Sequence, residues 1–154
     1  MSGVSIITGG GTGIGAALAK RLVSRSQKVL IVGRRANKLY ETKNGCSNPG
    51  LIRTVVADIS KPEGRQAILE SLGENERIDN LVHNAAILEP VGPLIDVRPE
   101  DWSKHMAINV DGPLFLTQTL LPMLMKKDEN DKGGRILHVS SGAAHHGYRG
   151  WVRI

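Results

Sequence analysis

The sequence predicts an α/β fold with an open, doubly wound parallel sheet, and three observations support this prediction. Short and mostly continuous apolar runs, typical of strands buried on both faces, alternate with stretches of helical periodicity. A glycine-rich turn at Gly9–Gly15 separates the first apolar run from the first helix. Neither a repeat nor a linker interrupts the pattern. Right-handed crossovers then give five strands the order 3-2-1-4-5.

Each element has its own signal. The runs expected to form strands are residues 4–7, 28–32, 51–57, 78–83 and 135–140. Helical periodicity covers residues 13–26, 62–72 and 99–127, and the last stretch is expected to be the longest helix. Ser60 is expected to cap the helix that starts at Pro62, and Pro99 opens the long helix. Together these elements form an incomplete Rossmann sheet with flanking helices in a single domain, residues 1–154.

Length and composition favour a soluble domain. The 154 residues are 40% hydrophobic and 23% charged, and no apolar run approaches the ~20 residues that cross a membrane. A net charge of +5 raises the possibility of a nucleic-acid partner. The basic residues are scattered, apart from clusters at 34–38 and 126–127, and only 3% of the chain is aromatic, which argues against such a partner. No secretory signal is visible and Cys46 cannot form an internal disulfide, so we expect a cytoplasmic protein.

The glycine turn predicts a phosphate-binding site. Residues 11–16, Gly-Thr-Gly-Ile-Gly-Ala, match the G-x-G-x-x-G/A pattern, follow an expected strand and open a helix whose free N–H groups face the turn. A flexible glycine-rich N-terminus is the alternative. The arrangement favours the pyrophosphate of a dinucleotide as the ligand.

The end of the second strand indicates which dinucleotide fits. An acid there would bind a free ribose 2′-OH and repel a 2′-phosphate, but the sequence has Gly33-Arg34-Arg35. Guanidinium groups bind phosphate through paired, charge-assisted hydrogen bonds. We therefore expect NADP(H) in preference to NAD(H). The alternative is that Arg34 and Arg35 belong to an exposed basic loop.

The wider turn carries a family resemblance. Thr8-Gly9-x-x-x-Gly13-x-Gly15 resembles the T-G-x-x-x-G-x-G cofactor fingerprint of the short-chain dehydrogenase/reductase family, with every defining position filled. The resemblance implies that these four residues, together with Ile14, belong to the cofactor site. Family members transfer hydride between a nicotinamide cofactor and a carbonyl or alcohol, so the resemblance implies an oxidoreductase with a small-molecule substrate.

Further segments extend the resemblance. Asp58 corresponds to the acid that binds the adenine ring in this family, although capping the next helix is its alternative role. Asn84-Ala85-Ala86 resembles the family's N-A-G segment, whose Asn steadies the sheet and whose small residues admit the cofactor. Ala86 replaces the usual glycine.

The resemblance also implies catalytic residues. Asn109 matches the Asn that organises a water in the proton relay, and its alternative is a polar residue tolerated near Gly112 and Pro113. Ser141 matches the substrate-orienting Ser, with Ser140 as the alternative.

The family's Tyr-x-x-x-Lys motif is expected about thirteen residues after the Ser. Counting from Ser141 reaches Ile154, and neither Tyr40 nor Tyr148 has a lysine four residues on. The loop 147–151 resembles the sepiapterin reductase and fungal benzil reductase branch. We therefore expect a chain truncated before the motif and inactive alone, because the Tyr and Lys supply the proton. A non-catalytic dinucleotide-binding or interaction fragment is the alternative function.

Other chemistries and assemblies have weaker signals. His145 and His146 are adjacent and lack a third ligand, so no metal site is expected. No G-x-S-x-G nucleophile elbow accompanies the serines, which argues against a hydrolase. The resemblance implies a homo-oligomer, since family members usually form one, but we do not expect this chain to form a stable homo-oligomer. The fifth strand would have an uncovered apolar edge, which predicts aggregation or dependence on a partner.

Overall fold

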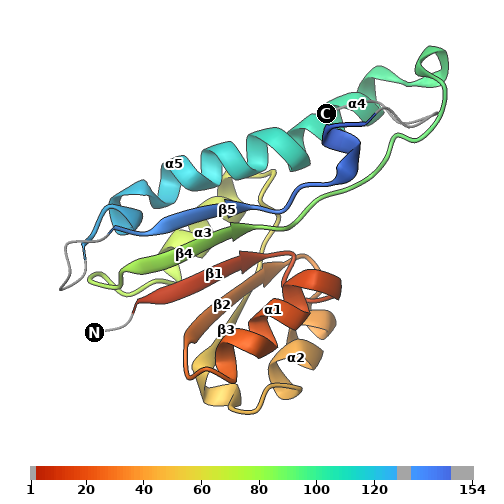
Figure 1. Cartoon of the computed structure of the whole chain (residues 1–154). Coiled ribbons are helices and arrows are strands. Elements are labelled where there is room, and N and C mark those ends of the chain that lie inside the picture. The colour runs from red at the N-terminus through yellow and green to blue at the C-terminus, as the bar shows by residue number, and fades with distance from the viewer. Residues whose placement is uncertain (1–2, 128–132, 147–154) are drawn as a thin grey trace.

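The computed structural model describes residues 3–127 and 133–146, and in these residues a parallel sheet lies between two layers of helices (Figure 1). The strands are β1 (Val4–Thr8), β2 (Lys28–Gly33), β3 (Ile52–Val56), β4 (Ile78–His83) and β5 (Arg135–His138). The sheet has the order β3-β2-β1-β4-β5 and every pairing is parallel. The predicted fold class and strand order are confirmed, although β3 and β5 are shorter than their apolar runs.

The apolar core lies on both faces of the sheet, as the continuous runs predict. Helices α1 (Gly13–Val23) and α2 (Ala36–Asn44) cover one face, where Ile7, Ile31 and Leu39 are buried together. Helices α3 (Pro62–Glu70) and α5 (Gly112–Leu124) cover the other face, where Ile6, Leu116 and Leu120 are buried together. Strands β1, β2 and β4 therefore place side chains into two separate clusters, which is the pattern of a doubly wound sheet.

The expected helix over residues 99–127 is interrupted. Helix α4 (Pro99–Met106) passes into a π-helical segment, Ala107–Asp111, before α5 begins. The amide of Gly112 donates to the carbonyl of Ala107, five residues back, and Pro113 has no N–H to donate to the carbonyl of Asn109. The proline therefore explains why a regular helix does not continue through Asn109.

The predicted Ser60 cap is wrong. Lys61 occupies the N-cap position of α3 and no side chain caps this helix. The amide and hydroxyl of Ser60 instead donate to Oδ1 of Asp58, at 3.0 and 2.7 Å. Asp58 thus stabilises the turn that precedes the helix. A short carboxylate side chain readily accepts a hydrogen bond from the backbone N–H two residues later in the chain, here that of Ser60.

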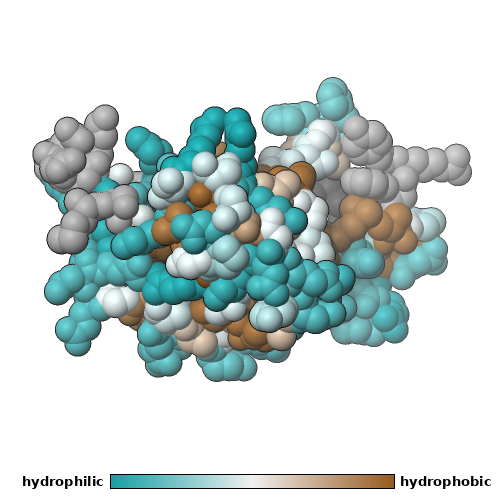
Figure 2. Space-filling view, turned by 90° about the horizontal axis from the view of Figure 1, so that it is seen from below, coloured by the Kyte–Doolittle hydropathy of each residue, from teal (hydrophilic) through white to brown (hydrophobic). Residues whose placement is uncertain are grey.

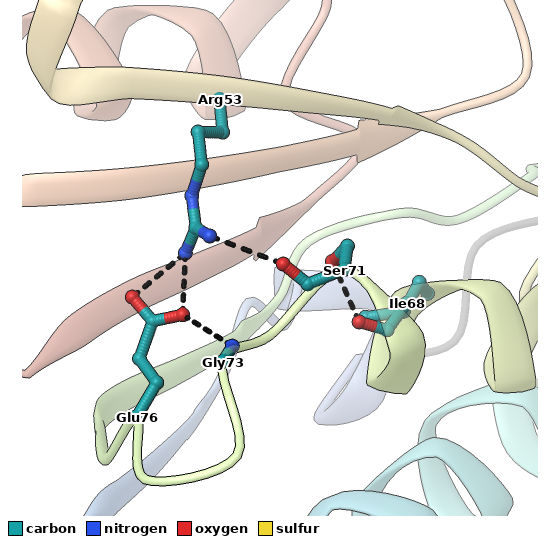
Figure 3. Close-up of polar contacts among 5 residues, drawn as sticks. All are labelled: Arg53, Ile68, Ser71, Gly73 and Glu76. Atoms are coloured by element: carbon teal, nitrogen blue, oxygen red, sulfur yellow. Dashed lines mark hydrogen bonds and ion pairs between the residues drawn. The ribbon is translucent and has the colours of Figure 1, made fainter.

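A polar network joins β3 to the loop between α3 and β4 (Figure 3). Nη2 of Arg53 lies 2.8 Å from each carboxylate oxygen of Glu76, and its Nη1 donates to the carbonyl of Ser71 at 3.1 Å. Glu76 also accepts a hydrogen bond from the amide of Gly73 at 3.2 Å. The network fixes this loop at the amino ends of the strands.

The surface is mixed, and β5 is its most exposed strand. Figure 2 shows a mainly hydrophilic face on which hydrophobic residues gather in separate patches. In the described part of the chain, β5 pairs with β4 alone, and Ile136 and Leu137 on it are 44% and 55% exposed. Among the same residues, no helix is both long and apolar enough to span a bilayer.

Candidate functional site

Two neighbouring cavities open at the carboxyl ends of the strands, where ligands bind in open α/β sheets. The narrow cavity, of about 320 Å³, lies between the glycine turn and the ends of β2 and β3. The wide cavity, of about 630 Å³, lies between the ends of β4 and β5 and the π-helical segment. Both cavities are lined by Ile14 and by residues 84–87, so these residues form their common wall.

The glycine turn has a conformation that side chains would disturb. Gly9 and Gly13 adopt φ angles of +66° and +54°, in the left-handed region that favours glycine. A Cβ on Gly15 would lie 2.5 Å from the carbonyl oxygen of Gly9, so α1 packs directly against the turn. Thr12 is the N-cap residue of α1, but its side chain makes no capping hydrogen bond to the first N–H groups of the helix.

Thr8 and Asn84 hold the turn to the sheet. The Thr8 hydroxyl, fully buried, accepts hydrogen bonds from the amides of Asn84 and Ala85, both at 3.0 Å. Nδ2 of Asn84 donates to the carbonyls of Thr8 and Gly9 at 3.0 and 3.2 Å. Thr8 does not line either cavity, so its contacts join the ends of β1 and β4, whereas Ala85 lines both cavities.

Charged residues gather on the narrow cavity. Arg34, Arg35 and Lys38 line it after β2, and Nη2 of Arg35 lies 3.5 Å from the Thr12 hydroxyl. Lys38 forms an ion pair with Glu41 at 2.7 Å. We call Arg34 and Arg35 the basic corner. Sequence reasoning placed Lys38 in a basic cluster but did not assign it to the site.

Asp58 lines the same cavity and carries a charge opposite to that of the basic corner. Burial acts to raise the pKa of its carboxyl, but the two hydrogen bonds from Ser60, with the charges of Arg34 and Lys61, lower the pKa overall. Asp58 is therefore ionised at neutral pH and has an acceptor oxygen for a ligand.

Asn109 lies on the wide cavity and is held by three polar contacts. Its Oδ1 accepts from the amide of Ile87 at 2.9 Å, and its Nδ2 donates to the carbonyl of Ile87 at 2.8 Å. Nδ2 also lies 2.9 Å from Nε2 of His105. The π-helical segment thus brings Asn109 against the loop that follows β4.

Ser140 and Ser141 both line the wide cavity. The hydroxyl of Ser141 accepts a hydrogen bond from the amide of Ala143 at 3.2 Å and so caps a short 3₁₀ turn, Gly142–Ala144. The structure places both serines and Asn109 in the lining of one cavity, and the choice between the serines stays a prediction. Tyr148 and the rest of the loop 147–151 lie outside the described residues.

Sequence reasoning missed a pair of histidines on the wide cavity. The rings of His83 and His138 stack with centroids 4.6 Å apart, and Nε2 of His83 lies 2.9 Å from the Thr117 hydroxyl. Burial, and secondarily the charge of His138, lowers the pKa of His83 to about 4. The only signal in the sequence was that each of two apolar runs has a histidine at or near its end. The sequence does not show whether these two histidines meet, because that depends on the register of β4 on β5. His145 and His146 are exposed, and residues 3–127 and 133–146 contain no group of three potential metal ligands.

Comparisons with known proteins agree with this geometry. A family model described as short chain dehydrogenase matches residues 3–153. Serine 3-dehydrogenase of Agrobacterium fabrum is 34% identical over 151 residues, 97% of this chain and 58% of that protein. The short chain dehydrogenase/reductase dpmpG of Macrophomina phaseolina is 30% identical over 146 residues, 93% of this chain and 82% of that protein.

Solved structures match in the same way. The crystal structure of the KRED1-Pglu enzyme has a TM-score of 0.86 and 30% identity, over 99% of this chain and 62% of that one. A closed form of serine dehydrogenase complexed with NADP+ has a TM-score of 0.82 and 26% identity, over 96% of this chain and 57% of that one. The chain spans between half and three fifths of the length of the first curated relatives that it matches.

Proposed function

Because the chain belongs to the short chain dehydrogenase family, we propose that its two cavities bind NADP(H) and that the protein is an oxidoreductase of carbonyl or alcohol substrates. The observation that carries the proposal is the basic corner beside the glycine turn, at the end of β2. The related serine dehydrogenase structure complexed with NADP+ supports it.

The size and continuity of the site suit a dinucleotide. The two cavities are neighbours that share residues 84–87 in their lining, so we propose that one extended ligand passes along this wall and occupies both. Asp58 and the basic corner then face the adenosine half, and the N-terminus of α1 faces the pyrophosphate. The nicotinamide half would lie in the wide cavity, beside Asn109 and Ser141.

The preference for the 2′-phosphate follows from charge. Arg34 and Arg35 are both exposed, and among the described residues the one acid that lines this cavity, Asp58, follows β3 and not β2. An acid at the end of β2 would bind the 2′-OH of NAD, and none is present there. We therefore propose NADP(H) as the preferred cofactor.

Bound cofactor would supply or accept a hydride. The protein must position the carbonyl of the substrate and donate a proton to its oxygen, or accept that proton in the reverse direction. Ser141 offers a hydroxyl to hold the carbonyl oxygen, and Asn109 would order the polar contacts at Ile87 in the same cavity. Reduction leaves an alkoxide that needs a positioned acid, worth about 10²–10⁴-fold in rate. No tyrosine in the 154 residues is followed four positions later by a lysine, the pair that supplies this acid in the family.

One experiment tests binding and chemistry separately. NADPH fluorescence is titrated with the protein, and NADPH oxidation is then followed with a diketone substrate. Saturable binding supports the cofactor site, and turnover above a no-enzyme control supports the oxidoreductase. Binding without turnover would favour a dinucleotide-binding protein that is not catalytic by itself. No binding at millimolar NADPH would contradict the proposal.

A further inference from the structure

The side-chain amide of Asn109 has only one orientation that satisfies its partners. The amide N–H of Ile87 can only donate and its carbonyl can only accept. Oδ1 of Asn109 must therefore face the N–H at 2.9 Å, and Nδ2 must face the carbonyl at 2.8 Å. Turning the amide over would set donor against donor and acceptor against acceptor at both contacts.

This orientation fixes the tautomer of His105. Nδ2 of Asn109 uses one hydrogen for Ile87, and its second hydrogen points to Nε2 of His105 at 2.9 Å. A nitrogen that accepts a hydrogen bond carries no proton, so the neutral His105 ring has its proton on Nδ1. Nδ1 in turn lies 2.5 Å from the carbonyl oxygen of Glu89, to which it donates. Both ring nitrogens are thereby used.

The His105 ring is itself held in place. It is only 7% exposed, and its ring stacks on that of Trp102 at 10° with centroids 6.3 Å apart. His105 and Asn109 are four residues apart, on the same side of the helical segment at the point where α4 becomes π-helical. The ring therefore bridges the helix to the loop at Ile87 and Glu89.

We propose that His105 is a positioning residue for the wide cavity. As the Nδ1–H tautomer it orients the Asn109 amide, which holds the loop at Ile87, a residue of the wall common to the two cavities. The role in catalysis rests on the proposed function, because the orientation of Asn109 matters to chemistry only if the wide cavity holds the reacting carbonyl. The hydrogen-bonded arrangement itself does not depend on that function.

Two substitutions separate the two hydrogen bonds of the ring. The terminal amide of glutamine reaches the position of the imidazole Nε2, so His105→Gln keeps an acceptor for Asn109. The amide of asparagine reaches the position of Nδ1, so His105→Asn keeps the donor to Glu89 and leaves Asn109 without its acceptor. The proposal predicts that His105→Gln changes NADPH affinity by less than about twofold. His105→Asn should weaken it roughly three- to tenfold, the value of one neutral hydrogen bond.

The test combines these variants with a spectrum of the wild-type protein. Long-range ¹H–¹⁵N correlation assigns the protonated imidazole nitrogen of each histidine, and the signal lost in His105→Gln identifies His105. A proton on Nδ1 is expected at neutral pH, and a proton on Nε2 would overturn the proposal. The control His146→Gln changes an exposed histidine that lines neither cavity, and it should leave NADPH affinity unchanged. Thermal melts identify any variant that fails to fold.

The outcomes distinguish this proposal from the proposed function. If wild-type protein does not bind NADPH, the proposed function fails, while the tautomer still decides whether His105 orients Asn109. If NADPH binds and the two variants weaken binding equally, the function stands and the positioning role is wrong. If the asparagine variant alone loses affinity and the spectrum shows Nδ1–H, both stand.

Discussion

The imidazole rings of His83 and His138 stack across β4 and β5, with their centroids 4.6 Å apart. His83 is 4% exposed, and the part of the structure described gives its Nδ1 no hydrogen-bond partner. A buried ring in this position is neutral, since protonation would place a charge away from water and next to a second histidine. The lining of the wide cavity therefore includes a histidine that resists protonation.

Acidification should destabilise the protein through His83. Its pKa is about 4 in the folded chain and about 6.5 in the unfolded chain, so between these values only the unfolded chain binds the proton. The free energy of unfolding should therefore fall by up to about 3 kcal/mol as pH drops from 7 to 4, with no effect of this group above pH 7. Urea unfolding of the wild type and of His83→Gln at several pH values measures the difference.

The matched variant is His138→Gln. It removes the neighbouring charge but leaves His83 buried, so most of the pH dependence should remain. The account of His83 is wrong if His83→Gln and the wild type lose stability in parallel, or if His138→Gln removes the whole effect.

Gly15→Ala should impair both folding and cofactor binding. Its Cβ would lie 2.5 Å from the Gly9 carbonyl oxygen, so α1 would have to move away from the turn. Such overpacking costs roughly 1–3 kcal/mol, and the displaced helix N-terminus should bind NADPH at least about tenfold more weakly. Gly73→Ala is the control, because its Cβ would approach nothing closer than 3.8 Å. Equal effects of the two substitutions would show that the turn tolerates a side chain.

Thr8→Val should lower stability more than its near-identical shape suggests. The variant removes the acceptor for the amides of Asn84 and Ala85. A buried N–H that loses its partner costs about 1–3 kcal/mol, so the loss should exceed about 2 kcal/mol for the pair. Chemical denaturation measures it, and Thr119→Val is the control, since the Thr119 hydroxyl is exposed and bonds only within its own helix. A loss below about 0.5 kcal/mol would mean that the two amides find other partners.

The fold followed from the sequence because hydrophobic pattern and turn chemistry are local. The runs around Ile6, Leu30 and Leu81 are apolar on both faces, which required a covered parallel sheet, and the glycine turn placed α1. Helix α2 was not delimited because its residues, Ala36–Asn44, are mostly polar and bury only Leu39 and Thr42. The Ser60 cap was wrong because Lys61 is the N-cap residue of α3, and the amide and hydroxyl of Ser60 donate to Asp58 instead.

The candidate site could be located but not completed from the sequence. Arg34, Arg35 and Asp58 were expected at the cofactor, and all three line the narrow cavity; their contact with a ligand stays a prediction. The partners of Asn109 could not be foreseen, since Ile87 lies on another element and the π-helical segment arises from the proline that follows. His83 and His138 likewise meet only through the register of β4 on β5.

The measurement that tests the central claim most directly compares NADPH and NADH binding in one double variant. Arg34→Ala/Arg35→Ala removes the basic corner, and Arg21→Ala/Arg25→Ala removes the same charge from exposed positions at the other end of α1. Fluorescence titration should show NADPH binding weakened roughly 10- to 100-fold in the first variant, the value of charge-assisted hydrogen bonds to a phosphate, with NADH changed less than about twofold. The control should bind both cofactors like the wild type. Equal losses for NADPH and NADH, or wild-type protein that binds NADH more tightly than NADPH, would contradict the assignment of this corner to the 2′-phosphate.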